Sequence, residues 1–172
     1  MIVWLNGTYG AGKSTLADLL AQALPARLFD SEHIGYLLRP IIGDIPCEDF
    51  KDWDPWRGLT IEPARQVLDF TGGTLVIPQT VLQHRYWTEL VDGFTEANIP
   101  MRAFTLHAER EVWAERVEAD TVETGAKAWR LDHREVYERA LSDWMARETT
   151  VVDTTGLAPD EAVKHLLAQL GA

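Results

Sequence analysis

Short apolar runs alternate along this chain with longer segments in which apolar residues recur every three or four positions. Such an alternation is typical of strands connected by amphipathic helices. We expect strands at Ile2–Leu5, Arg27–Asp30, Thr74–Gln79, Met101–Leu106 and Thr150–Asp153. The periodic segments predict helices at residues 13–23, 32–38, 61–71, 83–97, 108–119 and 132–147, and a last helix that begins at Pro159.

The order of these elements predicts a single α/β domain over residues 1–172, with a parallel sheet that helices cover on both faces. Thr60 is a candidate N-cap for the helix at 61–71. Ligands of such sheets bind beyond the carboxyl ends of the strands. The residues that follow each strand are therefore the candidate site.

The first strand leads into residues 7–14, which match the phosphate-binding loop pattern G-x-x-x-x-G-K-[ST] between a strand and a helix. Glycines allow the backbone to turn its N–H groups toward an anion, and the start of the helix adds a positive dipole end. Lys13 is predicted to neutralise phosphates and Ser14 to bind Mg²⁺. The predicted nucleotide contacts in this loop are Gly7, Thr8, Tyr9, Gly10, Ala11, Gly12, Lys13, Ser14 and Thr15.

Two acids follow the second strand. Asp30 is a candidate general base for an attacking hydroxyl, and Asp30 or Glu32 is a candidate Mg²⁺ ligand. The alternative is that Asp30 or Ser31 is an ordinary helix N-cap. The third strand is followed by Gln79 and Thr80 without an aspartate, which excludes an ATPase-type Walker B acid at this strand. These two residues are either substrate contacts or plain loop residues.

Arginines flank the polar stretch that follows the helix after the fourth strand, and residues 116–130 are predicted to form a lid. A movable cation that closes on the transferring phosphate suits phosphoryl transfer. Arg116 is the predicted catalytic arginine, and Arg130 is a predicted nucleotide contact; Arg110 is a weaker candidate. The alternative is that these arginines are solvated charges on helix faces. Thr154, after the fifth strand, is predicted to lie near the nucleotide base.

Residues 34–60 form an irregular insertion at the ligand-binding edge of the predicted sheet, and we expect it to bind the second substrate. Trp53, Trp56 and Arg57 are candidates to stack on and clamp a planar or sugar-like ligand. The alternative is that the tryptophans pack the insertion onto the body of the protein.

The charge and composition narrow the range of functions. The formal net charge of −11 argues against a nucleic-acid-binding surface. A single cysteine, Cys47, rules out an intramolecular disulfide and fits a reducing cytoplasm. The apolar run at residues 2–5 is too short for a signal or a membrane span. We therefore expect a cytoplasmic protein without stable membrane insertion.

The chain resembles the bacterial tunicamycin-resistance ATP-binding proteins. The similarity lies in residues 2–14 and in the segments Phe29–Tyr36, Val76–Pro78, Phe104–Ala108 and Val152–Thr154. The wider group is similar to small-molecule kinases such as chloramphenicol phosphotransferase, shikimate kinase and gluconate kinase. The resemblance implies a three-layer P-loop fold with strand order 2-3-1-4-5, a lid, and the use of ATP and Mg²⁺. It also implies that Lys13, Ser14, Asp30 and Arg116 occupy functional places.

Two functions fit this sequence. One is ATP-dependent phosphoryl transfer to a hydroxyl of a small molecule, such as tunicamycin or another nucleoside-like or sugar-like compound. The other is ATP-dependent sequestration of such a drug without turnover. A regulatory GTPase is disfavoured, because no Asn-Lys-x-Asp motif follows strand four or five.

Overall fold

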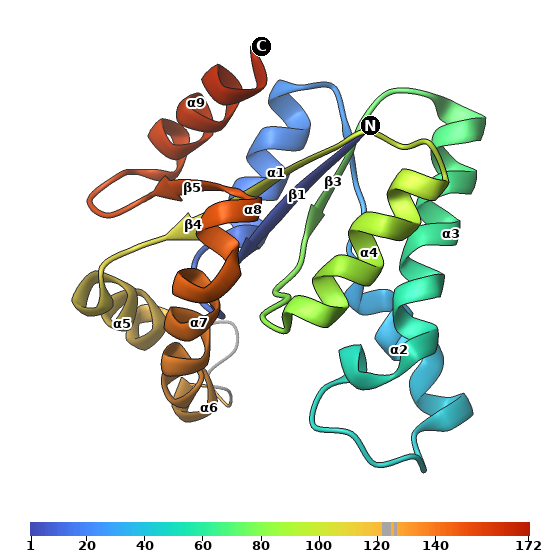
Figure 1. Cartoon of the computed structure of the whole chain (residues 1–172). Helices are drawn as coiled ribbons and strands as arrows, with labels where there is room; N and C mark the ends of the chain where they lie inside the picture. The colour runs from blue at the N-terminus through green and yellow to red at the C-terminus, as the bar shows by residue number, and fades with distance from the viewer. Residues whose placement is uncertain (122–124, 126) are drawn as a thin grey trace.

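A five-stranded parallel sheet forms the centre of the computed structural model, which describes residues 1–121, 125 and 127–172 (Figure 1). The strands are β1 (Ile2–Gly7), β2 (Arg27–Leu28), β3 (Leu75–Pro78), β4 (Met101–His107) and β5 (Thr150–Asp153). Their spatial order is β2-β3-β1-β4-β5, as the resemblance implies. In β1, Leu5 lies opposite Pro78, the last residue of β3, and Gly7, the last residue of β1, lies opposite Leu106 near the end of β4, so three strand ends meet at the same edge.

Helices cover both faces of the sheet because neighbouring side chains of β1 point to opposite sides. Val3 and Leu5 pack with α1 (Lys13–Ala23) and α9 (Pro159–Leu170). Trp4 and Ile2 face the second core. This second core includes residues of α2 (Glu32–Ile42), α3 (Asp54–Thr71), α4 (His84–Glu96) and α7 (Arg134–Ala140). The protein is thus the expected three-layer α/β fold.

The insertion contains more helix than the sequence pattern predicts. Helix α2 continues to Ile42 through Pro40, and α3 begins at Asp54 after a short 3-10 helix, η1 (Phe50–Asp52). The prediction that Thr60 is an N-cap is wrong: its hydroxyl donates to the Trp56 carbonyl inside α3. Burial of Ile34 and Leu38 in the second core stabilises α2 despite its proline.

The helical region after β4 is divided into several pieces. Helix α5 (Arg110–Ala119) is followed by α6 (Lys127–Asp132), α7, a π-helical turn (Leu141–Met145) and α8 (Ala146–Glu148), where one helix over 132–147 was predicted. The predicted lid spans α5 and α6, and its residues 122–124 and 126 lie outside the described part. Within the described ranges, no helix combines the length and the apolar character needed to cross a membrane.

Candidate functional site

The turn after β1 has the backbone shape of a phosphate-binding loop. Gly7 and Gly10 have φ angles of +138° and +78°, a region that side-chain-bearing residues rarely adopt. A Cβ at Gly7 would lie 2.7 Å from the Leu106 carbonyl oxygen, and one at Gly10 would lie 2.6 Å from Val117 Cγ2. Both positions therefore require glycine, and the loop is pressed against β4 and α5.

The loop leads into the start of α1, where no acidic side chain occupies the place of an anionic ligand. Helix α1 has no acid in its first turn and no side-chain N-cap, so its first N–H groups suit an anionic ligand. Lys13 Nζ donates to the Thr8 carbonyl at 2.8 Å, and Ser14 and Thr15 are exposed at the same helix end. The buried Thr8 hydroxyl makes no hydrogen bond within the described part of the chain. These residues fit the phosphates of a nucleotide and its Mg²⁺, which Ser14 would help to hold.

Two buried polar side chains fix the loop to the sheet, and the sequence gives little signal for them. Asn6 Oδ1 accepts hydrogen bonds from the backbone N–H groups of Gly7 at 2.8 Å and Val81 at 2.9 Å. Thr80 donates its hydroxyl to the Gly7 carbonyl at 2.9 Å. Of the two polar residues after β3, Thr80 thus positions the loop, and Gln79 is buried beside it. Asn6 and Val81 are 75 positions apart and Thr80 and Gly7 are 73 positions apart, so only the folded chain reveals these two contacts.

Asp30 follows β2 and caps the helix that begins there. Its Oδ1 accepts a hydrogen bond at 2.9 Å from the backbone N–H of Glu32, the first residue of α2. Ser31 is the N-cap residue by position, but its own side chain forms no capping bond, so Asp30 supplies the bond that the capping alternative expects. Its side chain keeps 40% of its surface exposed, so one carboxylate can both cap the helix and accept a proton. Among the described residues, no three His, Cys, Asp or Glu side chains gather as a metal site. The base role of Asp30 and the metal roles of Asp30 and Glu32 stay predictions.

A cavity of about 360 Å³ adjoins the loop at Tyr9. We call it the Tyr9 hollow; it joins the loop, the insertion, the start of α4 and the helices α6 and α7. The Tyr9 hydroxyl donates to Asp49 Oδ2 at 3.1 Å, and its ring lies 4.4 Å from that of Trp129. Lys13 Nζ lies 5.8 Å from the Tyr9 ring centre, so the hollow borders the phosphate loop. The residues that line it are Tyr9, Glu48, Asp49, Lys51, Asp52, Val81, Leu82, Gln83, Tyr86, Trp129, His133 and Val136.

The electrostatics of the Tyr9 hollow centre on a buried ion pair. Lys51 is 7% exposed and pairs with Asp49, while Asp52 accepts a hydrogen bond from the Tyr86 hydroxyl at 3.1 Å. Burial lowers the pKa of Lys51, although Asp49 and the nearby acids act in the opposite direction. Burial, followed by the charge of Asp49, raises the pKa of Tyr9 above its usual range. Tyr9 was expected only to touch the nucleotide, and the sequence pattern gave no individual signal for Asp49, Lys51 and Asp52.

The prediction that Trp56 and Arg57 clamp a ligand is wrong. Trp56 is fully buried and donates its Nε1–H to the Ser31 carbonyl at 3.0 Å. Arg57 is 2% exposed, pairs with Glu89 and donates to the Lys51 carbonyl at 2.7 Å. Trp53 is also buried, with its Nε1–H bonded to the Ile45 carbonyl. The packing alternative is therefore the one the structure supports. These side chains hold η1 in place, and η1 carries Lys51.

The candidate lid arginines all have protein partners here. Arg116 donates to the Thr154 hydroxyl at 3.0 Å and to the Thr154 carbonyl at 2.7 Å. Arg130 donates to Asp120 Oδ2 at 2.6 Å, and Arg110 pairs with Glu138. Arg116 and Thr154, predicted separately, thus form one contact at the end of β5. Whether either residue touches a nucleotide, and whether Arg130 does, stays a prediction.

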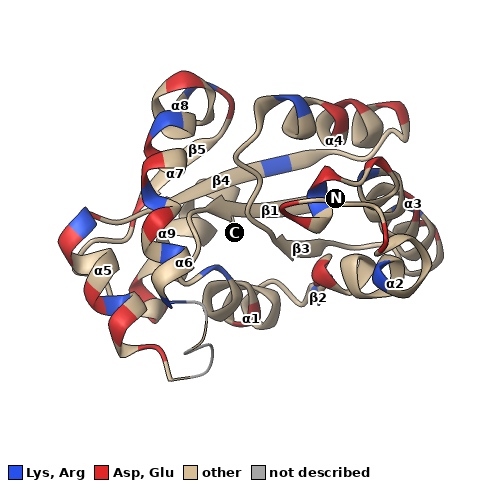
Figure 2. Ribbon diagram, turned by 90° about the horizontal axis from the view of Figure 1, so that it is seen from below, with Lys and Arg blue, Asp and Glu red and all other residues tan. Residues whose placement is uncertain are grey.

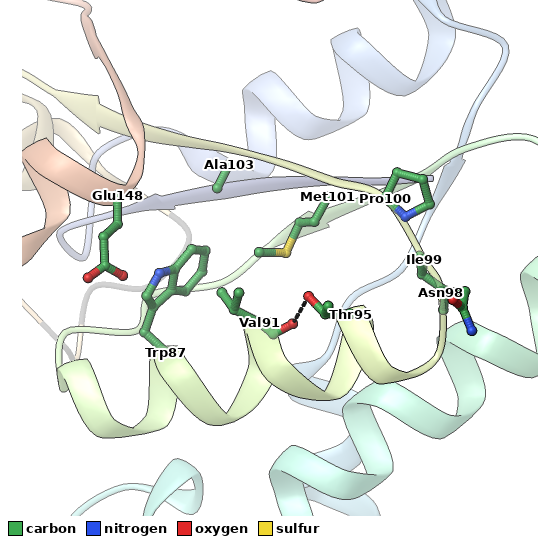
Figure 3. Close-up of a pocket in the computed structure, with 9 residues that line it drawn as sticks. All are labelled: Trp87, Val91, Thr95, Asn98, Ile99, Pro100, Met101, Ala103 and Glu148. Atoms are coloured by element: carbon green, nitrogen blue, oxygen red, sulfur yellow. Dashed lines mark hydrogen bonds between the residues drawn. The ribbon is translucent and has the colours of Figure 1, made fainter.

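A second hollow lies at the other end of the sheet and is not the candidate site. It has a volume of about 610 Å³ and lies between α4 and the start of β4, with Trp87, Val91 and Met101 on its walls (Figure 3). Met101 is paired with Ile2, so this hollow is beside the amino ends of the strands. Ligands of parallel α/β sheets bind at the opposite, carboxyl ends.

Comparisons with known proteins agree with this fold. The structure of the Deinococcus radiodurans tunicamycin resistance protein matches with a TM-score of 0.76 at 24% identity, covering 99% of this chain and 95% of that one. A Sinorhizobium meliloti gluconokinase matches with a TM-score of 0.68 at 21% identity, covering 98% and 90%.

In sequence, an adenylyl-sulfate kinase of Burkholderia ambifaria is 37% identical over a match of 91 residues, and the match covers 49% of this chain. The match spans about half of that relative, 46% of its length. A family model described as an AAA domain matches residues 2–136. Since that match covers well over half of the chain, the protein belongs to this AAA domain family, with the P-loop fold of small-molecule kinases.

Proposed function

We propose that this protein is an ATP-dependent phosphotransferase that phosphorylates a hydroxyl group of a small molecule. The observation that carries the proposal is the position of the Tyr9 hollow, which opens beside Lys13 of the phosphate loop. A nucleotide on the loop would present its γ-phosphate toward a molecule in this hollow. The similarity to kinases of known acceptors, an adenylyl-sulfate kinase and a gluconokinase, supports the proposal.

In this proposal each part of the site has one task. The loop N–H groups and Lys13 bind the phosphates, and Ser14 holds Mg²⁺, with Asp30 and Glu32 as further candidates. When bound, Mg²⁺ supplies charge neutralisation for the phosphates. Asp30 accepts the proton of the attacking hydroxyl. Residues 116–130 act as the lid, and the insertion at 34–60 forms the acceptor side through Asp49, Lys51 and Asp52. We place the protein in the cytoplasm.

Sequestration of a drug without turnover is the second candidate. It is favoured by the name of one structural neighbour, a tunicamycin resistance protein, because resistance describes an outcome and not a reaction. Binding of tunicamycin that requires ATP, without ADP formation, would be its signature.

The decisive experiment measures ADP formation with ATP–Mg²⁺ and a panel of hydroxyl-bearing acceptors that includes tunicamycin. The Lys13→Ala variant is the matched negative control. Acceptor-dependent ADP release, with a phosphorylated product seen by mass spectrometry, supports the kinase. Tight tunicamycin binding in the presence of ATP, without any product, would refute the kinase proposal and support sequestration. Neither binding nor turnover with any acceptor would refute both.

A further inference from the structure

The walls of the Tyr9 hollow divide into an aromatic and apolar part and an acidic part. Tyr9, Tyr86 and Trp129 contribute aromatic rings, and Val81, Leu82 and Val136 contribute apolar surface. The ring of Tyr9 meets that of Trp129 edge to face, with 4.4 Å between the centroids and 64° between the planes. Ring-bearing ligands pack well against such surfaces, because their faces are apolar while their edges form hydrogen bonds.

The charged side chains of the hollow are mostly carboxylates. Glu48, Asp49 and Asp52 line it together with a single lysine, Lys51, among the described residues. Lys51 is already engaged, since its Nζ is buried against Asp49 and lies 4.6 Å from the Phe50 ring centre. Glu32 also contributes negative charge near this lysine. Three carboxylates against one lysine give the described lining a net formal charge of −2, and like charges across a site are strongly unfavourable for an anionic acceptor.

The carboxylates and hydroxyls suit a ligand with several hydroxyl groups. Asp49 and Asp52 accept hydrogen bonds from the Tyr9 and Tyr86 hydroxyls. Both carboxylates also cap η1, since Asp49 Oδ1 accepts from the Lys51 backbone N–H and Asp52 Oδ2 accepts from the backbone N–H groups of Glu48 and Asp49. Each carboxylate therefore has room for about one further hydroxyl donor. Gln83 supplies an amide at the same wall. Hydroxyl donors are therefore favoured, and carboxylate or phosphate groups, which are acceptors only, find few donors here.

Resting on the phosphotransferase proposed above, we infer that the acceptor is an uncharged polyhydroxylated molecule with a ring, such as a sugar or a nucleoside that carries no phosphate, sulfate or carboxylate. In the reaction, the acceptor oxygen forms a bond to the γ-phosphorus, and the bond from that phosphorus to the bridging oxygen of ADP breaks. The hydroxyl proton passes to the Asp30 carboxylate, and ADP leaves.

The test uses pairs of compounds that differ in charge: glucose with gluconate, and uridine with uridine monophosphate. Of the seven tryptophans, all in the described part of the chain, Trp129 is 41% exposed and each of the others is at most 8% exposed. Acrylamide quenching with the non-hydrolysable AMPPNP and Mg²⁺ therefore reports on this hollow, and Trp129→Phe identifies the signal. We expect a neutral compound to protect Trp129 at a concentration at least about tenfold lower than its anionic partner.

A charge reversal at the rim provides the second arm. Glu48→Lys should reduce the difference between the concentrations at which neutral and anionic compounds protect Trp129. Glu96→Lys, at the far end of α4, should leave that difference unchanged. Equal or tighter binding of the anions to the unaltered protein would overturn the inference, as would the absence of protection by every compound. Protection by neutral compounds without ADP formation would refute the kinase but not the assignment of the hollow. ADP formation with the anionic compounds only would support the kinase and refute the inference that the acceptor is uncharged.

Discussion

At the scale of single residues, Lys13 is the side chain whose removal is expected to have the largest effect on nucleotide binding. Its Nζ donates to the Thr8 carbonyl at 2.8 Å, so it already lies over the loop that it would share with a phosphate. Lys13→Ala should abolish measurable ATP–Mg²⁺ binding by calorimetry and leave the fold intact, because the side chain is only half-buried. Lys164→Ala, on the exposed side of α9, is the control. If Lys13→Ala bound ATP–Mg²⁺ with wild-type affinity, the assignment of residues 7–14 as a phosphate-binding loop would be refuted.

Asp30 combines a capping role with the proposed base role, and one substitution separates them. Asp30→Asn keeps an Oδ1 that can accept from the Glu32 N–H, but it loses the charge and the basicity. We expect thermal stability and ATP affinity to change little while phosphoryl transfer slows by roughly 10²- to 10⁴-fold. Single-turnover kinetics measures this step directly. A wild-type rate would mean that Asp30 is a helix cap only, and lost ATP binding would point to metal coordination.

The sequence predicts the phosphate loop better than the acceptor side for a physical reason. The loop is local, since its glycines, Lys13 and Ser14 lie within eight positions. The Tyr9 hollow depends on contacts over long separations, such as the Tyr9 hydroxyl with Asp49 and the Trp113 Nε1–H with the Tyr9 carbonyl at 2.8 Å. Tryptophans in an irregular segment suggest ligand binding, but Trp53 and Trp56 are buried in the protein. Lys51, which no sequence pattern marks, lines the hollow instead.

At the scale of elements, α3 carries the stability of the acceptor side. Its buried face includes Trp56, which is packed against Phe50 with 5.7 Å between ring centroids. Trp56→Ala should lower the free energy of unfolding by about 3–5 kcal/mol, because a large cavity is left behind and the Ser31 carbonyl, which still accepts from the Ile34 N–H, loses its bond from the indole. Denaturant unfolding measures this loss. Phe70→Ala on the same helix is the control, since Phe70 is 92% exposed.

ATP affinity should distinguish this structural role from a ligand-binding role. The loop is held by Asn6 and Thr80 and not by α3, so Trp56→Ala should bind ATP–Mg²⁺ like the wild type at temperatures where it is folded. A variant with unchanged stability and weaker acceptor binding would restore the clamp interpretation of Trp56.

Element boundaries show where sequence patterns stop being informative. The apolar periodicity indicated α4 nearly to its ends, at 83–97 against His84–Glu96. It missed the first two turns of α3, where Pro55 stands at a position that suits a helix start and Trp53 is the N-cap residue. It also missed the π-helical turn in which Trp144 and Met145 turn into the core, because that distortion follows from packing.

At the scale of the whole molecule, the alternation of apolar runs and helical patterns was sufficient to predict the fold class. Five apolar runs separated by helical patterns predicted a parallel sheet, and all five runs are strands of that sheet. The strand order came from the family resemblance, since hydrophobic patterns carry no information on which strands are neighbours. Figure 2 shows basic and acidic segments interspersed along α5 and α7, in keeping with a chain that has 27 acidic and 16 basic residues.

Stability should depend on pH through a contact that joins the sheet to the helices after it. His107 ends β4, and its Nδ1 lies 3.0 Å from the Tyr137 hydroxyl of α7. Burial, and then the charge of Arg134, lowers the pKa of His107, while Asp153, Glu138 and Glu109 oppose the shift. The unfolded chain keeps the ordinary histidine pKa of about 6.5 and therefore binds more protons than the folded chain just below that pH.

The free energy of unfolding should consequently fall as the pH is lowered from about 7.5 to about 5, a window above the ordinary carboxylate pKa values. His107→Gln keeps a polar partner for Tyr137 but cannot titrate, so its stability should fall less over the same range. Urea unfolding at several pH values measures both curves. A variant curve parallel to that of the wild type would show that His107 is not the group responsible. The exposed His165 of α9, changed to Gln, is the matched control.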